Sequence, residues 1–174
     1  MALNLASIVE NGTLEYPEQT ALIYNTVRLS YAELRTHAMQ FANVLRAIGI
    51  SRGDKVALML PNGPVFTIAY YGILYAGAVV VPLNILLVGD EVAYHLTDSD
   101  AKAFVVWEDL LKPGLYGFNQ VDTCRHLFFV RTNAPTLPFY YGEMERHGQE
   151  KVKDGSRAID FERACSAADS ECDM

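Results

Sequence analysis

Residues 56–89 read VALMLPNGPVFTIAYYGILYAGAVVVPLNILLVG, and this stretch contains no Asp, Glu, Lys or Arg. Turn residues divide it into three apolar pieces, which are Val56–Leu60, Val65–Ala76 and Ala78–Val81. Short continuous apolar runs are typical of strands buried on both faces, and the longer run between them has the length of a crossover helix. The stretch therefore predicts a strand–helix–strand unit with parallel strands and a right-handed crossover.

The same stretch is long enough to be weighed as a membrane span. Gly72 and Gly77 interrupt its longest apolar run, Pro82 lies at one end, and no cluster of Lys or Arg flanks it closely. Its tyrosines lie in the middle of the run, whereas membrane proteins place them at the two interfaces. Because a buried parallel sheet gives the same composition, a soluble core is the favoured interpretation.

The composition of the 174-residue chain, with 51% hydrophobic and 20% charged residues, indicates one globular domain with a real core. The net charge of -7 argues against a nucleic-acid groove, because such grooves are basic. Three cysteines without Cys-x-x-Cys spacing argue against a disulfide framework or a zinc site and fit reduced thiols in a cytosolic protein. The chain does not begin with a basic segment and an apolar core, so no signal peptide is expected.

Two small elements are predicted before the first long helix. Residues 1–20 predict a short helix and a loop, with Leu3, Leu5 and Ile8 on one face of the helix. Residues 21–29 contain two short apolar runs separated by a turn, which predicts a small β-hairpin.

Ser30 starts the clearest helix, since Glu33 follows three residues later and completes a capping box. Gly49 supplies the left-handed residue at its end. His37 lies off the apolar face, where a solvated position is favoured over a catalytic one. The apolar residues recur at spacings of three and four and form one stripe. The stripe consists of Tyr31, Leu34, Ala38, Phe41, Leu45 and Ile48.

The residues that follow the first two predicted strands are turn and cap residues. Asn62 is expected to cap the crossover helix, with Pro64 in its first turn, and this ordinary capping is favoured over an anion site. Asn84 marks the turn after the second strand. Glu91 and His95 lie one turn apart on the next helix, and a surface pair is favoured over a metal site because no third ligand is evident.

Two more buried strands are predicted at Ala103–Trp107 and Leu127–Val130. Glu108–Arg125, between them, predicts a helix interrupted by Lys112-Pro113-Gly114. The fold class is therefore α/β, with a parallel-sheet βαβ core, flanking helices and a small N-terminal β-hairpin.

The character of the chain changes at Arg131, where prolines and polar residues predict an irregular stretch. Phe161–Ala168 predicts one short helix within it. The chain therefore divides into an α/β subdomain, residues 1–130, and an irregular polar extension, residues 131–174.

Familiar catalytic motifs are missing, including the dinucleotide fingerprint, the nucleophile elbow and the zinc-protease helix. Gly72 and Gly77 have half the spacing of a phosphate loop, but no lysine follows, so they are interpreted as packing glycines. Ligands of open parallel sheets lie outside the C-terminal ends of the strands. The candidate substrate-binding residues at those ends are Asn62, Asn84, Glu108 and Arg131.

Five short motifs follow one another in this chain. They are Tyr31-Ala32-Glu33-Leu34, Gly53-Asp54-Lys55-Val56-Ala57, Leu60-Pro61-Asn62, Ala76-Gly77-Ala78 and Val81-Pro82-Leu83-Asn84. Their order and spacing resemble the N-terminal part of the adenylate-forming enzymes of the ANL superfamily, in particular the acyl-CoA synthetases (fatty-acid–CoA ligases). The resemblance runs from about Tyr16 to Val106 and more loosely to Ala168.

The resemblance implies a two-step reaction in the full-length enzyme. A carboxylate attacks the α-phosphate of ATP to give an acyl-adenylate and pyrophosphate, and the thiol of coenzyme A then displaces AMP. It implies ATP, Mg²⁺ and coenzyme A as cofactors and a fatty or other carboxylic acid as substrate. It also implies a cytoplasmic protein, and a peripheral contact with a membrane stays open.

The family's phosphate loop, adenine-contacting motif, ribose-binding aspartate, hinge and late catalytic lysine are absent from these 174 residues. No catalytic residue or metal ligand is therefore assigned, and no cofactor is expected to bind this part alone. The chain is expected to be inactive by itself and to self-associate through an uncovered sheet edge or apolar face. Two alternatives stay open: a non-catalytic binding or scaffold module of the same fold, and an acyl-AMP ligase or other carboxylate-adenylating enzyme.

Overall fold

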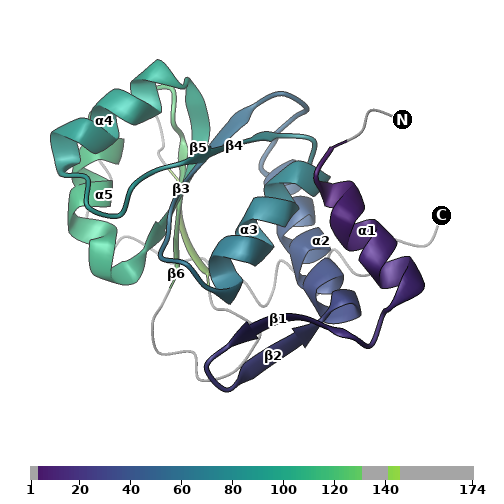
Figure 1. Ribbon diagram of the computed structural model, residues 1–174. Coiled ribbons are helices and arrows are strands. Elements are labelled where there is room, and N and C mark those ends of the chain that lie inside the picture. Colours follow the sequence, from purple (N-terminus) through teal and green to yellow (C-terminus); the bar gives the residue numbers. More distant parts are fainter. Residues whose placement is uncertain (1–3, 131–140, 146–174) are drawn as a thin grey trace.

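The computed structural model describes residues 4–130 and the backbone of residues 141–145 (Figure 1). The helices are α1 (Ala6–Glu15), α2 (Tyr31–Ala47), α3 (Pro64–Tyr75), α4 (Gly89–Asp98), the 3₁₀ helix η1 (Glu108–Leu110) and α5 (Leu111–Phe118). The strands are β1 (Thr20–Tyr24), β2 (Val27–Ser30), β3 (Lys55–Met59), β4 (Val79–Pro82), β5 (Ala101–Trp107), β6 (His126–Val130) and β7 (Tyr141–Glu145).

One sheet with helices on both faces forms the centre of the molecule (Figure 1). Its strand order is β4-β3-β5-β6-β7, in which the first four strands are parallel and β7 runs antiparallel to β6. Helices α2 and α3 cover one face, and α4 and α5 cover the other. The antiparallel hairpin β1–β2 forms a separate sheet beside the first helix layer. The predicted α/β fold class, with its parallel core and small hairpin, is confirmed.

The uncharged stretch forms the predicted unit β3–α3–β4, and β3 pairs in parallel with β4. Strand β3 lies inside the sheet and is buried from Val56 to Met59. Strand β4 lies at the edge of the sheet, and Val79 is 46% exposed. The expectation that both strands are buried on both faces is therefore wrong for β4. Its apolar sequence looks like that of an inner strand, because the residues of a strand do not specify its place in the sheet.

The apolar stretch does not form a single long helix. Its longest run is divided between α3, which has 12 residues, a left-handed turn at Gly77 and the extended strand β4. Within the residues that the structure describes, no helix combines the length and the apolar character that crossing a bilayer requires.

Two hydrophobic cores lie on opposite faces of the sheet. Val56 and Leu58 of β3 belong to the core under α2 and α3, whereas Ala57 and Met59 belong to the core under α4 and α5. Successive side chains of a strand point to opposite faces, so both sets must be apolar when both faces are covered. This explains why β3 reads as a continuous apolar run.

The capping box at the start of α2 is confirmed. The Ser30 hydroxyl accepts the Glu33 N–H at 3.2 Å, and the Glu33 carboxylate accepts the Ser30 N–H at 2.8 Å. The Ser30 hydroxyl also donates to the Glu33 carboxylate at 3.0 Å. The hydrogen bond from the Ser30 backbone N–H, and then this one from its hydroxyl, lower the pKa of Glu33. Gly49 follows the helix with the expected left-handed φ of 88°.

Gly72 allows α3 to lie close against α2. A Cβ atom at this position would lie 2.9 Å from the Ala38 carbonyl oxygen and 2.8 Å from the Phe41 ring. The interpretation of Gly72 as a packing glycine is confirmed. Gly77 has another role, since its φ of 81° makes the turn between α3 and β4.

Helix α1 forms as predicted, but the face that it buries differs from the predicted one. Ala6 and Val9 are buried, whereas Leu5 and Ile8 are 52% and 54% exposed. The predicted apolar face is therefore wrong for these two residues, and Leu3 lies outside the described residues. The helix begins one residue after Leu5, and its buried Val9 belongs to a core cluster with Leu29, Leu34 and Ile68.

Helix α5 differs from the prediction for Glu108–Arg125. The 3₁₀ helix η1 comes first, α5 follows at Leu111, and it ends at Phe118. The Lys112-Pro113-Gly114 sequence lies inside the start of α5 and does not interrupt it. Proline is tolerated there because N–H groups in the first turn have no partner within the helix.

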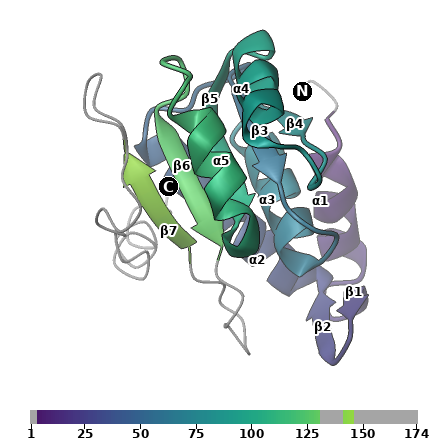
Figure 2. The ribbon, with the colours of Figure 1, turned by 90° about the vertical axis from the view of Figure 1, so that its left-hand side faces the viewer.

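Strand β7 lies in the stretch that the sequence predicts to be irregular. It pairs antiparallel with β6 over five residue pairs, from His126↔Glu145 to Val130↔Tyr141, and lies beside it in Figure 2. Its sequence, YGEME, has no run of β-branched residues, so pairing with β6 decides its conformation. The helix predicted at Phe161–Ala168 lies outside the described residues.

We predict that Gly72→Ala lowers the free energy of unfolding by about 1 to 2 kcal/mol. The clash with the Ala38 carbonyl outweighs the gain in helix propensity, which is about 1 kcal/mol. Gly63→Ala at the start of α3 is the control, because its Cβ would meet nothing closer than the Tyr24 ring, at 3.7 Å. Urea unfolding of both variants measures this, and equal stability of the two would contradict the close packing of α2 and α3.

We also predict that the capping box weakens in acid. The pKa of Glu33 is lower in the folded state than its usual value of about 4.5. The contribution of Glu33 to folding stability is therefore fully present above that usual value. It is lost as pH falls through the folded-state pKa. Glu33→Gln keeps an acceptor but cannot titrate. Between about pH 5 and about pH 3, the wild type should lose more stability than this variant. Glu18→Gln, a substitution of an exposed glutamate, is the control.

Candidate functional site

The C-terminal ends of four parallel strands meet at one edge of the sheet. In spatial order these strands are β4, β3, β5 and β6. Asn84, Asn62 and Glu108 follow the first three of them, so the structure brings three predicted site residues to the same edge. Arg131 comes directly after β6 and lies outside the described residues. That these residues bind substrate stays a prediction.

The strand order singles out Asn62 and Glu108. Strands β3 and β5 are neighbours, yet the chain leaves β3 toward α3 on one face and leaves β5 toward α5 on the other face (Figure 1). In open α/β sheets a ligand crevice forms where neighbouring strands send their connections to opposite faces. Asn62 and Glu108 flank this switch point, whereas Asn84 follows the edge strand.

Asn62 does not cap α3, so the expectation that it does is wrong. Gly63 occupies the N-cap position, no side chain caps the helix there, and Pro64 occupies the first turn as expected. The Gly63 backbone is extended, and its carbonyl accepts the Thr67 N–H at 3.2 Å. The exposed side chain of Asn62 forms no hydrogen bond with any described residue, so its amide is available at the switch point.

Asn84 shapes the loop after β4, as predicted. Its side-chain oxygen accepts the Leu86 N–H at 2.9 Å, and its carbonyl accepts the Leu87 N–H at 3.2 Å. The side-chain oxygen is therefore used by the turn, which leaves the amide N–H groups of Asn84 as its donors.

Glu108 begins η1 and is half-buried at the end of β5. The neighbouring Asp109 is exposed, and its carboxylate accepts the Trp107 indole N–H at 3.3 Å. Glu108 is thus the first carboxylate after β5, at the C-terminal end of the strand.

No metal site is found among the described residues, because they contain no group of three suitable His, Cys, Asp or Glu side chains. The Glu91 carboxylate accepts the Val88 N–H at 3.0 Å at the start of α4, and His95 packs edge-on against Tyr94. His37 on α2 lies 3.3 Å from the side-chain oxygen of Gln40. These contacts agree with surface roles for Glu91, His95 and His37.

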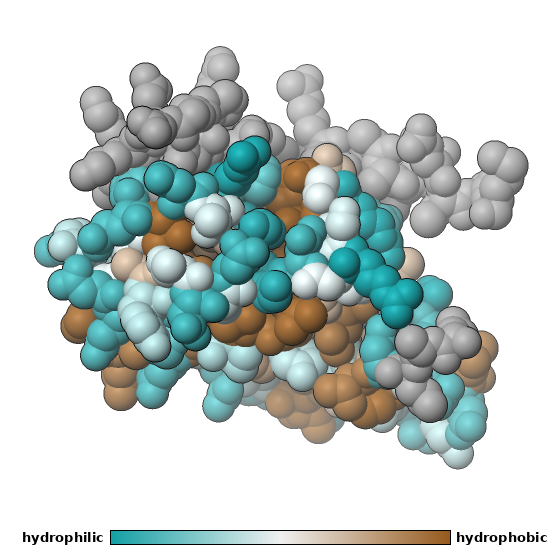
Figure 3. Space-filling view, turned by 90° about the horizontal axis from the view of Figure 1, so that it is seen from above, coloured by the Kyte–Doolittle hydropathy of each residue, from teal (hydrophilic) through white to brown (hydrophobic). Residues whose placement is uncertain are grey.

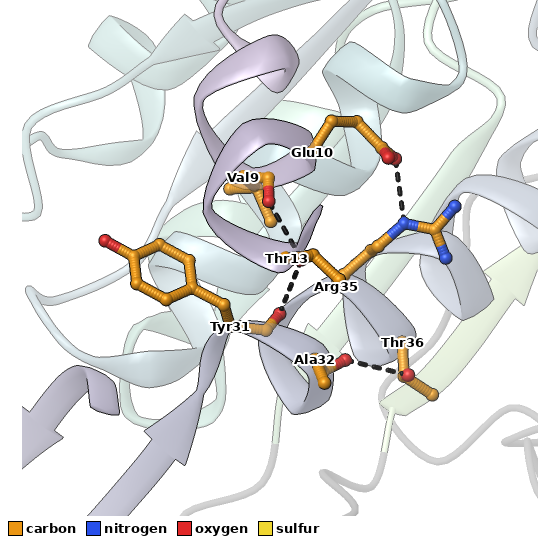
Figure 4. Close-up of polar contacts among 7 residues, drawn as sticks. All are labelled: Val9, Glu10, Thr13, Tyr31, Ala32, Arg35 and Thr36. Atoms are coloured by element: carbon orange, nitrogen blue, oxygen red, sulfur yellow. Dashed lines mark hydrogen bonds and ion pairs between the residues drawn. The ribbon is translucent and has the colours of Figure 1, made fainter. Parts of the chain in front are cut away.

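A polar cluster fastens α1 to α2 (Figure 4). The Arg35 Nε donates to the Glu10 carboxylate at 2.8 Å, and the Thr13 hydroxyl lies 2.8 Å from the Val9 carbonyl and 3.2 Å from the Tyr31 carbonyl. Sequence reasoning missed this cluster, because its members are up to 25 residues apart and no motif connects them.

Tyr75 of α3 lies beside the same cluster, and its hydroxyl is buried without a hydrogen-bond partner among the described residues. Burial, and then the charge of Glu10, raise the pKa of Tyr75 far above its usual value. Its hydroxyl therefore loses its proton at a higher pH than that of an ordinary tyrosine. The cluster connects α1, α2 and α3.

A hollow of about 490 Å³ lies at the opposite, N-terminal end of the strands. It carries charges of both signs, and several of these already have partners: Asp54 accepts the Ser51 N–H at 2.7 Å, and Lys102 pairs with Asp100 at 2.9 Å. No single ligand chemistry follows from this lining. The lining residues are Ile48, Gly49, Ile50, Asp54, Lys102, Asp122, Thr123, Arg125 and His126.

Comparison with known proteins finds one matching family model and several similar proteins. The family model described as "AMP-binding enzyme" matches residues 9–154. A long-chain-fatty-acid–CoA ligase of Bacillus subtilis (strain 168) is 37% identical over 109 residues, which are 63% of this chain and 19% of that protein. The chain therefore spans about a fifth of the length of this curated relative.

Two solved structures share the fold. A benzoate CoA ligase from Burkholderia xenovorans LB400 matches with a TM-score of 0.68 and 28% identity, over 74% of this chain and 26% of that chain. The N-terminal domain of FACL13 from Mycobacterium tuberculosis matches with a TM-score of 0.67 and 28% identity, over 76% of this chain and 35% of that chain. The likeness covers most of the chain that the structure describes.

We predict that Tyr75→Phe leaves the free energy of unfolding unchanged or raises it by up to about 1 kcal/mol. The variant removes a buried hydroxyl that has no hydrogen-bond partner among the described residues and leaves the packing of the ring intact. Thermal or urea unfolding measures this. A loss of more than about 1 kcal/mol would show that the hydroxyl makes a stabilising hydrogen bond.

Proposed function

Because the chain belongs to the AMP-binding enzyme family, whose model matches residues 9–154, we propose that it forms the N-terminal part of an ATP-dependent acyl-CoA ligase. The observation that carries this proposal is its 37% identity over 109 residues with a long-chain-fatty-acid–CoA ligase. The structural match to a benzoate CoA ligase, with 28% identity and a TM-score of 0.68, is a second line of support that comes from the fold.

The proposed substrate is a carboxylic acid, with a fatty acid as the first choice. In the complete enzyme the carboxylate attacks the α-phosphate of ATP, pyrophosphate leaves, and the thiol of coenzyme A displaces AMP from the acyl-adenylate. ATP, Mg²⁺ and coenzyme A are the proposed cofactors, and Mg²⁺ would offset phosphate charge. The described residues contain no group of three side chains suited to hold a metal ion.

The proposed contribution of residues 1–130 is an α/β subdomain, which residues 131–174 connect to the phosphate-binding part of the ligase. Asn62 and Glu108 are the residues of this subdomain best placed to touch a ligand, because they flank the switch point. The Asn62 amide can donate and accept a hydrogen bond, and Glu108 can accept one. Asn84 and Arg131 are the outer members of the same proposed edge.

Two other functions stay open. A non-catalytic binding or scaffold module would use the same fold with a ligand or partner of its own, and an acyl-AMP ligase or other carboxylate-adenylating enzyme would share the first reaction step. The gene sequence beyond codon 174 distinguishes the binding-module alternative from the proposed ligase. A continuing frame with a phosphate loop and a late lysine supports the ligase, whereas a stop codon favours the binding module.

We predict that residues 1–174 alone release no pyrophosphate from ATP above background in the presence of a fatty acid. The groups expected to bind the phosphates lie outside this part of the ligase. A coupled pyrophosphate assay measures this, with the complete ligase as the positive control. Release that depends on the fatty acid would contradict the proposal that this part is inactive.

In the complete ligase, we predict that Asn62→Ala lowers kcat/KM by about tenfold, which corresponds to one lost hydrogen bond of about 1.4 kcal/mol. The exposure of Asn62 implies little change in stability. Asn43→Ala on α2 is the matched control, because that residue lies on a helix away from the strand ends. Equal activity of the two variants would remove Asn62 from the site.

A further inference from the structure

The exposed hydrophobic side chains of the described residues are spread over several elements. They lie on and beside α1, on the hairpin, at and after β4, and on α4 and α5, and they reach the surface in several separate places in Figure 3. This distribution does not single out one docking surface. The covalent chemistry of two exposed asparagines is more specific, because each of them precedes a glycine.

The two Asn-Gly pairs of the chain are Asn11-Gly12 and Asn62-Gly63. The backbone nitrogen that follows an asparagine can attack the side-chain amide, and glycine hinders this attack least because it has no Cβ. Asparagine is for this reason among the thermolabile residues of proteins. The attack requires that the glycine nitrogen and the asparagine side chain can approach each other, so the fold decides how fast each pair reacts.

The first pair lies inside α1, where the helix opposes the reaction. Backbone N–H groups in an α-helix donate to the carbonyl four residues earlier, and the Gly12 carbonyl itself accepts the Tyr16 N–H at 2.8 Å. A Cβ atom added at Gly12 would collide with the Tyr31 ring, so the backbone here is closely packed. The Gly12 nitrogen can therefore reach the Asn11 side chain only when the helix opens locally.

The second pair lies in the bend between β3 and α3, where no described residue restrains it. The Asn62 side chain is exposed and forms no hydrogen bond with a described residue, and the Gly63 N–H donates to none of them either. Gly63 is extended, with a φ of 168°, as expected for a residue before a proline. A Cβ atom added at Gly63 would come no closer than 3.7 Å to the Tyr24 ring. The nitrogen and the amide are therefore both accessible.

We propose that Asn62 is a site of spontaneous deamidation in the folded protein. The Gly63 backbone nitrogen forms a bond to Cγ of Asn62, and the bond from Cγ to the side-chain nitrogen breaks. Water carries the proton of the Gly63 N–H to this leaving nitrogen, which departs as ammonia. The succinimide that remains takes up one water molecule, and opening at either of its carbonyls gives aspartate or isoaspartate at position 62. Water is the co-reactant, and nothing is oxidised or reduced.

Either product changes the edge of the sheet at which the proposed ligand site lies. Both products carry a negative charge that Asn62 lacks, at the same edge as Glu108, and this charge repels an anionic substrate. Isoaspartate also lengthens the main chain directly before Gly63, the N-cap residue of α3. The effect on activity rests on the proposed function, whereas the deamidation itself does not.

Peptide mapping by mass spectrometry tests the proposal on the complete protein. The folded protein is incubated at mildly alkaline pH, and the mass gain that separates aspartate from asparagine is followed at both Asn-Gly pairs. We expect conversion at Asn62 to be at least about tenfold faster than at Asn11, because the helical pair must first open. In urea the two rates should become similar. Equal rates in the folded protein, or a rate ratio that urea leaves unchanged, would overturn the proposal.

Gly63→Ala is the matched variant, because its methyl group hinders the attacking nitrogen and the surroundings have room for it. We expect this variant to slow conversion at Asn62 by about tenfold and to leave the rate at Asn11 unchanged. Equal rates at Asn62 in the variant and the wild type would overturn the proposal.

The kcat/KM of the complete ligase is measured during the same incubation. It should fall in step with the converted fraction of Asn62 in the wild type, and it should stay near its starting value in Gly63→Ala. Conversion with undiminished ligase activity would confirm the modification and remove Asn62 from the ligand site. Conversion in a complete protein that has no CoA-ligase activity would confirm the modification and remove the proposed function alone.

Discussion

The covering of β3 on both faces is the constraint on which the rest of this structure depends. Alternate side chains of β3 from Val56 to Met59 enter two separate cores, so all four are apolar and a helix layer covers each face. The crossover helix α3 supplies one layer together with α2, and α4 and α5 supply the other. Gly72 then lets α2 and α3 lie close enough to close the first core.

The same constraint decides where chemistry can take place. When both faces are covered, the sheet is open only at its edges and at the ends of its strands. The C-terminal ends bring Asn62, Asn84 and Glu108 to one side, and the change of connection between β3 and β5 favours the space between Asn62 and Glu108. The relatives reported above are several times longer than this chain.

The two edges of the sheet differ in kind. Strand β4 ends in a proline and is followed by exposed aliphatic side chains, whereas β7 is an antiparallel strand with glutamates at 143 and 145. The edge at β4 carries no charged residue between positions 79 and 89, which sets it apart from the charged edge strands that are common in monomeric proteins.

The sequence by itself determined the local elements of this protein. The uncharged stretch specified β3–α3–β4, and Ser30 with Glu33 specified the start of α2, because periodicity and capping act between residues close in the chain. The tertiary structure alone decided that β4 is an edge strand, that β7 forms from a polar segment, that Gly63 rather than Asn62 occupies the N-cap position of α3, and that Glu10 meets Arg35. Each of these depends on which elements become neighbours in space, and strand order and helix docking are set by packing between segments far apart in sequence.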